Sequence, residues 1–307
     1  MIGIIGLGVV GKAVRDGYTE LGMNGILTYD INDSGNCTSL ETLVLDYCAE
    51  TKYLVICLPT PREVNGDPDY SYVSNTLAEL NRLGNKKPVI IKSTVSPKFL
   101  TVSELLCDFP IIANPEFLSA RTAKEDFKIP ILIVWGGNDE NLLRQVMNDL
   151  HHPYWNIPLK LYMTSLESAM KIKLAMNSFG ALKITFFNIL KEWGGNDYDH
   201  IKNALIDSGW VAEQHTDVPG HDGKYGFGGA CLPKDISAMR HALIAEGVSG
   251  SSLLNTVITT NDLTFRGKED CMYCVDGVAG DVSRTCPKCG GKGHKWKKSN
   301  VDTGGEL

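Results

Sequence analysis

The chain has 307 residues, of which 43% are hydrophobic and 21% charged, and its formal net charge is −6. This composition is typical of a soluble globular protein of two domains, and it argues against a global attraction to nucleic acid or anionic membranes. The sequence contains no apolar run of the roughly 18 residues that predict a membrane span. We expect Met1 to lead directly into a strand and not into a signal peptide.

The first half of the chain alternates short apolar segments with segments of helical periodicity. Six apolar segments predict parallel strands covered on both faces: Ile2–Ile5, Ile26–Tyr29, Tyr53–Leu58, Val89–Lys92, Ile111–Ala113 and Ile131–Trp135. Helices are predicted between them, for example at Val9–Leu21, Val73–Leu83 and Asn141–Leu150. The order predicts an α/β fold whose first domain is a doubly wound Rossmann sheet.

The first strand is followed by a G-x-G-x-x-G motif, which consists of Gly6, Leu7, Gly8, Val9, Val10 and Gly11. The next strand ends at Asp30, about 20 residues later, as in dinucleotide-binding folds. Gly6 would make the tight turn, Gly8 would admit a pyrophosphate, and Gly11 would allow helix and sheet to pack closely. Because the Asp30 carboxylate can bind a ribose diol and repels a 2′-phosphate, we predict NAD as cofactor and not NADP. The alternative is a glycine turn that binds no ligand.

An all-α region with one long helix is predicted after His151-His152-Pro153, where the alternation stops. Thr164-Ser165-Leu166-Glu167 has the spacing of a capping box, and no proline follows before Trp193. A helix of this length crosses a domain or forms a dimer face, so we expect a homodimer. Shorter helices are predicted at Asp199–Ser208, Ile236–Glu246 and Ser252–Phe265. The predicted domains are 1–155 for cofactor binding, 156–266 for the helical centre and dimer contact, and 267–307 for a small tail.

A glycine-rich segment, Gly226-Phe227-Gly228-Gly229-Ala230, leads directly to Cys231, and Lys234 and Asp235 follow. Glycines let backbone pass close to a bound molecule. A thiol in such a place can attack a carbonyl carbon if its thiolate is favoured. For an isolated cysteine, a buried structural role in a glycine-rich loop is the favoured interpretation.

Taken together, these motifs resemble the UDP-glucose and UDP-N-acetylmannosamine 6-dehydrogenases, which use NAD to oxidise a nucleotide sugar to a uronic acid. The resemblance spans residues 1 to about 262 and follows the family's order. Its further elements are Leu58-Pro59-Thr60-Pro61, Lys92-Ser93-Thr94, Asn114-Pro115-Glu116-Phe117-Leu118, the pair Lys173 and Asn177, and Gly226 to Asp235. It implies an enzyme that transfers two hydrides per substrate, with UDP-glucose as the first candidate sugar nucleotide and UDP-N-acetylmannosamine as the second.

The resemblance also implies roles for individual residues. Cys231 would add to the intermediate aldehyde, and its thiohemiacetal would become a thioester after the second hydride transfer. Lys173 and Asn177, four residues apart on one helix face, would stabilise the alkoxide. Asp235 would position a water molecule or the catalytic lysine. Glu116 would act as general base for the water that hydrolyses the thioester, and Thr94 would bind the same water.

Cofactor and substrate contacts follow from the same resemblance. Beside the glycine motif and Asp30, the implied NAD contacts are Pro59, Thr60 and Thr94. The implied substrate contacts are Glu116, Phe117, Leu118, Lys173, Asn177, Tyr225, Phe227, Gly228 and Lys234; for the two aromatic residues of the cysteine segment, packing is the alternative.

The chain departs from the family pattern in two respects. Ala120 stands where many members have a second glutamate, and Arg121 stands where glycine is common. In addition, the sequence after Phe265 is too short for the domain that usually covers the UDP. Ala120 implies that the role of the second glutamate is absent or moved, whereas Arg121 and the short C-terminal sequence weaken the inference about which sugar nucleotide is bound.

The tail contains Cys271, Cys274, Cys286 and Cys289, two C-x-x-C pairs whose spacing predicts a four-thiolate zinc site. The second pair resembles the cysteine-rich zinc modules of DnaJ chaperones. Two redox-sensitive thiol pairs are the alternative. The five other cysteines are scattered, which is typical of a reducing cytoplasm. Lysines around Trp296 are too few to predict nucleic-acid binding, so a structural or protein-binding role is favoured for the tail.

Two other functions remain open from the sequence. A β-hydroxyacid dehydrogenase has the same Rossmann start and a Lys-x-x-x-Asn helix, but it transfers one hydride and needs no thiol. A catalytically idle NAD-binding module could use the zinc tail to hold a partner. The presence of Cys231 argues against the first alternative, and the complete set of candidate catalytic residues argues against the second.

Overall fold

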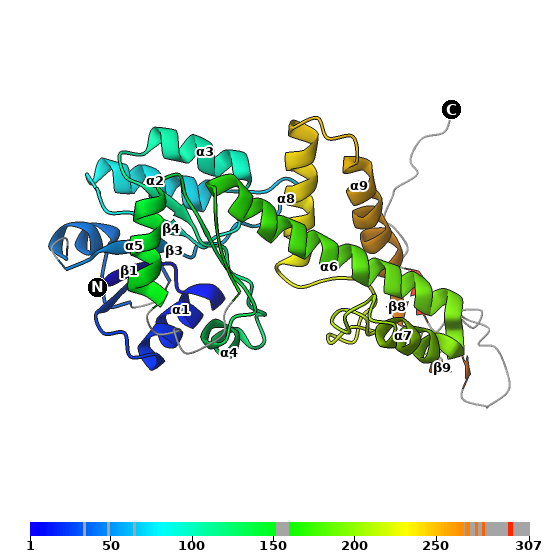
Figure 1. Cartoon of the computed structure of the whole chain (residues 1–307). Helices are drawn as coiled ribbons and strands as arrows, with labels where there is room; N and C mark the ends of the chain where they lie inside the picture. The colour runs from blue at the N-terminus through cyan, green and yellow to red at the C-terminus, as the bar shows by residue number, and fades with distance from the viewer. Residues whose placement is uncertain are drawn as a thin grey trace. The chain divides into compact units, whose positions relative to one another are not determined.

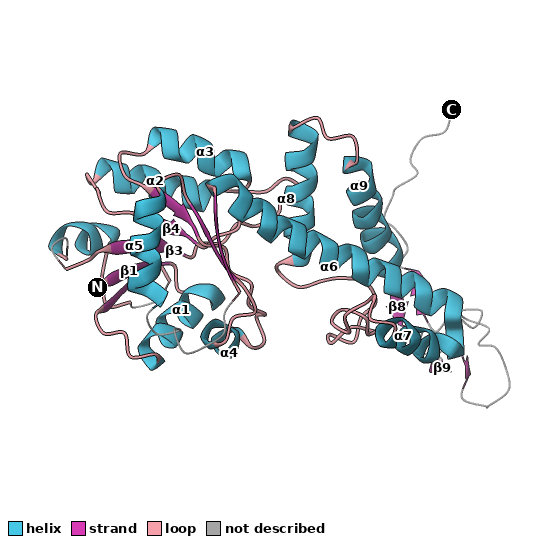
Figure 2. Cartoon of the chain, in the orientation of Figure 1, coloured by secondary structure: helices cyan, strands magenta, loops and turns pink. Residues whose placement is uncertain are grey.

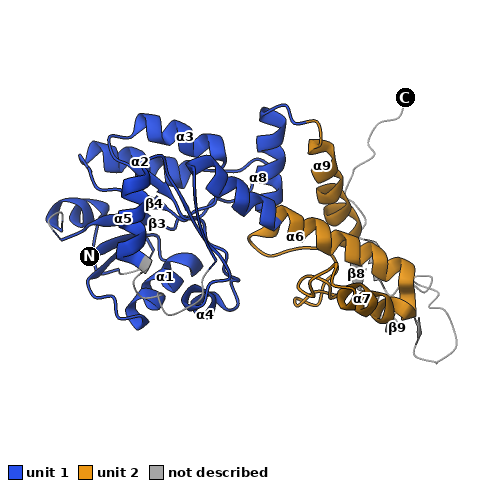
Figure 3. Ribbon diagram, viewed as in Figure 1, with its two compact units in different colours: residues 1–177, 234–248 blue, residues 178–233, 249–307 orange. Residues whose placement is uncertain are grey.

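The computed structural model describes residues 1–32, 35–47, 50–63, 66–151 and 160–266, and in the remainder only the backbone of four short strands. The chain forms two compact units that interleave along the sequence (Figure 3). The first unit contains Met1–Asn177 and Lys234–Val248, and the second contains Ser178–Pro233 and Ser249–Leu307.

A sheet covered by helices forms the centre of the first unit (Figure 1). It has seven strands, in the order β2-β1-β3-β4-β5-β6-β7. Neighbouring strands from β2 to β5 are parallel, β6 runs antiparallel to β5, and β7 is parallel to β6. The strands are β1 Ile2–Ile5, β2 Ile26–Tyr29, β3 Tyr53–Ile56, β4 Val89–Ile91, β5 Ile111–Ala113, β6 Ile133–Gly136 and β7 Leu161–Thr164. The positions of the six predicted strands are confirmed within two residues, but the parallel direction predicted for the sixth is wrong, because β6 is antiparallel to β5. The seventh, β7, was not predicted because its half-exposed residues lack the apolar run of the others.

Helices cover both faces of this sheet (Figure 2). Side chains alternate along the strands, so one face packs on α2, α3 and the start of α6, and the other packs on α1, α4 and α5. The helices are α1 Val9–Glu20, α2 Ser71–Arg82, α3 Pro97–Leu106, α4 Ala123–Lys128 and α5 Glu140–His151. α3 and α4 were not predicted, although Ser96 caps α3 by accepting a hydrogen bond from the N–H of Phe99.

The long helix is α6, Leu166–Gly194, with 29 residues, and it continues from the first unit into the second. Its predicted extent is confirmed, but the predicted capping box is wrong. Thr164 is the last residue of β7, and the cap is Ser165, whose hydroxyl accepts the N–H of Ser168. Glu167 instead bonds Thr101 and Lys171.

The second unit is helical apart from its tail. After α6 it contains the short 3-10 helix η3 Gly195–Asp197, α7 Tyr198–Asp207, a loop, α9 Ser251–Thr259 and the π-helix η4 Thr260–Phe265. One of its cores joins Phe187, Leu190, Tyr198 and Val218. α8, Leu232–Ala245, begins at the end of the loop that contains Cys231, and most of it belongs to the first unit.

These units do not follow the predicted domain boundary at residue 155, since β7 pairs with β6 and the first part of α6 packs against the sheet.

In the tail, β8 Lys268–Asp270 pairs antiparallel with β11 His294–Trp296, and β9 Cys274–Val275 pairs with β10 Val278–Ala279. The side chains of the four predicted zinc ligands lie outside the described residues.

Candidate cofactor and catalytic site

The predicted site residues of the first unit gather at one edge of the sheet. β1, β3, β4 and β5 are parallel neighbours, so the segments that leave their carboxyl ends lie next to one another. These segments are the glycine motif, Leu58–Pro61, Lys92–Thr94 and Asn114–Leu118. This edge is where open α/β sheets bind their ligands.

The glycine motif has the backbone geometry of a dinucleotide turn. Gly6 has φ +94°, and a Cβ there would lie 2.7 Å from the carbonyl oxygen of Cys57. A Cβ on Gly11 would lie only 1.8 Å from the carbonyl oxygen of Gly6, so the first turn of α1 rests on the loop. Gly8 precedes α1 and has open space around its Cβ direction. The turn therefore leaves room for a pyrophosphate at Gly8 and none at the other two glycines.

Asp30 lies beside this turn. Its Oδ2 accepts a hydrogen bond from the N–H of Leu7 at 2.6 Å, and its Oδ1 accepts one from Asn32 at 2.8 Å. The carboxylate thus holds the turn in place and remains partly exposed. Of the other predicted cofactor contacts, Pro59 is exposed, Thr60 is buried and Thr94 is half-buried.

Glu116 forms an ion pair that the sequence did not predict. Its Oε2 lies 2.8 Å from the ammonium of Lys92, and the two side chains are only 12% and 6% exposed. Oε1 accepts the N–H of Phe117 at 3.1 Å, and Lys92 also lies 5.5 Å from the centre of the Phe127 ring. Lys92 had no assigned role. The sequence feature that could have identified Lys92 is its position at the carboxyl end of a central parallel strand.

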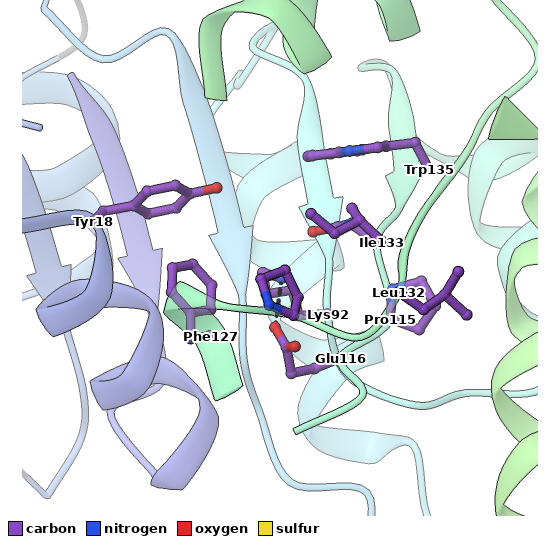
Figure 4. A pocket seen from close by; sticks show the side chains of 10 residues that line it. Tyr18, Lys92, Pro115, Glu116, Phe127, Leu132, Ile133 and Trp135 are labelled. Atoms are coloured by element: carbon purple, nitrogen blue, oxygen red, sulfur yellow. Dashed lines mark hydrogen bonds and ion pairs between the residues drawn. The ribbon is translucent and has the colours of Figure 1, made fainter. Parts of the chain in front are cut away.

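A small cavity of about 20 Å³ adjoins this ion pair, with room for about one water molecule (Figure 4). Tyr18, Phe127 and Trp135 contribute aromatic walls. Burial raises the pKa of the nearby Cys57 thiol to about 12, and burial together with the Glu116 charge raises the pKa of Tyr18. Both groups therefore stay neutral at physiological pH, and the ion-pair partner of the Glu116 carboxylate is the Lys92 ammonium.

A second cluster joins the predicted catalytic residues of α6 and α8 within the first unit. Asp235 is 1% exposed, and its Oδ2 accepts a hydrogen bond from the Asn177 amide at 2.5 Å. Its Oδ1 pairs with the ammonium of Lys234. Lys173, one turn before Asn177, is buried, and its ammonium lies 5.3 Å from the centre of the Phe117 ring. Phe117 therefore links this cluster to Glu116.

Cys231 belongs to the second unit, where its side chain is a free, exposed thiol. The glycine turn before it is anchored by three polar residues that the sequence did not single out, Asn188, Asn261 and Arg266. Phe227 is buried and Tyr225 packs on the core of the unit, so both make packing contacts.

The two departures from the family pattern lie on the surface of the first unit. Ala120 and Arg121 are both exposed, on the loop that follows Leu118. Leu118 itself packs against the sheet core that contains Trp135. In the described part of the chain, no group of three or more His, Cys, Asp or Glu residues is arranged to hold a metal ion, and no helix is both long and apolar enough to cross a membrane.

The fold and the glycine turn define a Rossmann-type dinucleotide-binding protein with a helical second unit. Residues 36–155 match the NAD binding domain of the UDP-glucose/GDP-mannose dehydrogenase family, and residues 167–263 match its central domain. The chain belongs to this family. The first match begins after the glycine motif and Asp30, and the geometry of the turn is what supports a cofactor role for those residues.

Relatives with known names agree with this assignment. A UDP-glucose 6-dehydrogenase of Rickettsia bellii is 31% identical over 235 residues, which cover 75% of this chain and 52% of that protein. A GDP-mannose 6-dehydrogenase of Pseudomonas savastanoi pv. phaseolicola is 26% identical over 287 residues, covering 86% of this chain and 61% of that protein. The chain thus spans about half to three fifths of these relatives' length.

Solved structures show the same fold. A UDP-glucose dehydrogenase from Pyrobaculum islandicum superposes with a TM-score of 0.70 at 23% identity, covering 85% of this chain and 67% of that one. A 3-hydroxyisobutyrate dehydrogenase from Mycobacterium tuberculosis superposes with a TM-score of 0.67 at 18% identity, covering 85% and 92%. Fold alone therefore does not separate a nucleotide-sugar dehydrogenase from a β-hydroxyacid dehydrogenase.

Proposed function

We propose that this protein catalyses the NAD-dependent oxidation of the C6 alcohol of a nucleotide sugar to a uronic acid. The observation that carries the proposal is the presence in the first unit of two sets of contacts, one that joins Lys92, Glu116, Phe117 and Lys173 and one that joins Asn177 and Asp235. Lys173 and Asn177 lie one turn apart on α6. These residues come from separate motifs that match the family's order. Folding has brought them together, which an idle NAD-binding module would not require.

NAD fits the glycine turn, because the open direction at Gly8 admits a pyrophosphate and α1 presents its unpaired N–H groups there. Asp30 would bind the adenosine ribose diol with the part of its carboxylate that stays exposed. When bound, NAD accepts the hydride in each oxidation. Side chains of this protein would orient the sugar, donate or accept the protons that the reaction transfers, and keep other water molecules away from the reacting carbon.

The second hydride transfer needs a tetrahedral carbon that carries the hydride, and a covalent adduct of the aldehyde supplies one. We assign to Cys231 the attack on the C6 aldehyde that the first oxidation leaves, giving a thiohemiacetal whose oxidation yields a thioester. Lys173 and Asn177 would stabilise the oxygen that carries negative charge. Water would then cleave the thioester to the carboxylic acid and return the thiol. Glu116, beside a cavity of water size, is the candidate general base for that water.

An NADH-release screen over UDP-, GDP- and CDP-sugars tests this function. UDP-glucose is the first candidate, and GDP-mannose and UDP-N-acetylmannosamine are the next. Two NADH per sugar are expected, whereas a β-hydroxyacid dehydrogenase would release one. Cys231→Ser should stop at or before the covalent step, because a neutral hydroxyl is a much weaker nucleophile than a thiolate. Full turnover by this variant would refute the covalent mechanism, and NAD binding with no turnover of any sugar would support the idle module.

We also propose a homodimer built on the second unit's part of α6. Phe179, Phe186 and Trp193, spaced seven residues apart, and Ile189 are all exposed on this helix. A heptad-spaced apolar stripe of this kind is typical of helices that pair with a second copy. Sedimentation equilibrium would measure the assembly directly.

For the tail we propose zinc binding by Cys271, Cys274, Cys286 and Cys289. Four thiolates are a donor set that suits tetrahedral Zn²⁺, and the pairing of β8 with β11 closes the chain segment that contains all four. One zinc per chain is expected by elemental analysis of protein purified without chelator. Cys286→Ser should lose it, and zinc-free wild-type protein would contradict the assignment.

A further inference from the structure

The glycine turn that precedes Cys231 is anchored by side chains distant in the sequence. The N–H of Gly226 donates to Asn188 at 2.9 Å, and the N–H of Phe227 donates to Asn261 at 2.7 Å. The Arg266 guanidinium donates to the carbonyls of Gly226 and Phe227, each at 3.0 Å. Every backbone polar group of these two residues therefore has a partner.

Arg266 is itself fixed by a third contact. Its Nη1 pairs with Asp222 at 2.7 Å, and the side chain is only 22% exposed. The planar fork of a guanidinium can hold two successive carbonyls and a carboxylate at once, which a lysine ammonium cannot do with the same geometry. Through these three interactions the rigid guanidinium of Arg266 holds the turn in place.

The side chains that anchor the turn lie so close to its backbone that only glycine fits at two of its positions. Gly226 has φ +68°, and a Cβ there would lie 2.4 Å from the Asn261 side-chain oxygen. A Cβ on Gly228 would lie 2.5 Å from the Arg266 guanidinium. A run of glycines has high conformational entropy, so without such anchors it would not present the following residue in one position.

The π-helix η4 explains how one element supplies both anchors. Asn261 and Arg266 are five residues apart, and in an α-helix they would lie about 140° apart around the axis. In η4 the N–H of Arg266 donates to the carbonyl of Asn261 at 2.7 Å, which is the wider π-type turn. This turn brings both side chains to the Gly226-Phe227 backbone, and π-turns are frequent at functional sites.

We propose that Asn261 and Arg266 are positioning residues that hold Cys231 where it can react. The inference rests on the proposed function, in which Cys231 is the nucleophile. Neither residue touches the reacting atoms in this role. They act through the glycine turn, and their loss should affect the covalent step more than the binding of NAD, because a misplacement of about 1 Å can cost roughly a hundredfold in rate.

Arg266→Lys is the variant that tests the proposal, and Arg82→Lys is its control, since Arg82 pairs only locally with Glu79 on α2. Arg266→Lys should lower kcat by about tenfold to a hundredfold while the KM for NAD changes by less than about twofold. The rate of Cys231 alkylation by iodoacetamide, measured on its peptide by mass spectrometry, should change by about threefold or more. Half-buried Cys107 in the other unit serves as internal reference and should keep its rate.

Alkylation needs neither NAD nor sugar, so it decides the proposal even if no sugar nucleotide is turned over. Wild-type kinetics and a wild-type Cys231 alkylation rate in Arg266→Lys would overturn it. If that variant does not fold, hydrogen exchange in the wild-type protein decides. The amides of Gly226 and Phe227 should exchange far more slowly than those of an open glycine loop, and exchange at the open-loop rate would overturn the proposal.

Discussion

The ammonium of Lys92 and the carboxylate of Glu116 lie 2.8 Å apart in a nearly closed part of the first unit. Removing both charges from water is costly, so the pair stabilises the fold only while both partners are present. It also holds the carboxylate of the candidate base Glu116 in one orientation beside the small cavity. One contact therefore serves both the stability of the sheet edge and the proposed chemistry.

Breaking this pair should be strongly destabilising. Lys92→Met leaves Glu116 buried without its partner and should lower the free energy of unfolding by about 3–5 kcal/mol. Lys92→Met/Glu116→Gln should recover most of that loss. Lys86→Met is the control, since Lys86 and its partner Asp108 are largely exposed at a similar distance of 3.3 Å, and little change is expected. Equal losses from both single variants in urea titrations would show that burial does not matter here.

The two later glycines of the motif should respond differently to alanine. At Gly11 the new methyl group would overlap the carbonyl of Gly6, so Gly11→Ala should lose several kcal/mol of stability. At Gly8 the space is open, so Gly8→Ala should stay within about 1 kcal/mol of wild type. Its NAD affinity, measured by calorimetry, should nevertheless fall by about tenfold or more because the methyl group occupies the pyrophosphate position. Unchanged NAD affinity in Gly8→Ala would place the cofactor elsewhere.

Buried Cys57 should make the protein less stable at alkaline pH. Its pKa is raised from 9.0 to about 12 by burial, so between these values the folded protein keeps a proton that the unfolded chain releases. The free energy of unfolding therefore falls as pH rises through this window, by about 1.4 kcal/mol for this group between pH 8 and 10. Well below pH 9 the thiol is protonated in both the folded and the unfolded chain, so it does not change the free energy of unfolding there. Urea titrations of Cys57→Ala should show a shallower decline over this interval, and parallel declines would contradict the assignment.

The exposed stripe on α6 should control assembly. Phe186→Glu places a charge in the middle of the proposed dimer contact and should give monomers in sedimentation experiments. Trp210→Glu is the matched control, because Trp210 is an even more exposed apolar residue of the same unit that lies outside α6. A dimer that survives Phe186→Glu, or is lost equally in Trp210→Glu, would refute this interface.

Much of the first unit could be predicted because its signals are local. Each of the six predicted strands is a short apolar run, and the glycine motif combines strand, turn and helix within a few residues. β7 and the true cap of α6 were missed because they depend on contacts between segments and not on a local signal. β7 is defined by its pairing with β6, and Thr164, which looks like a cap, is used as the end of that strand.

Spacing along the chain was sufficient to predict the first six strands, the long helix and the glycine turn, and the candidate catalytic residues followed from the order of motifs that the chain shares with the family. The tertiary structure decided which of these residues hold one another. Lys92 meets Glu116 across 24 positions, Asn177 meets Asp235 across 58, and Arg266 reaches Gly226 across 40. No local periodicity encodes such pairs, because they arise only when separate elements pack and their buried polar groups must find partners.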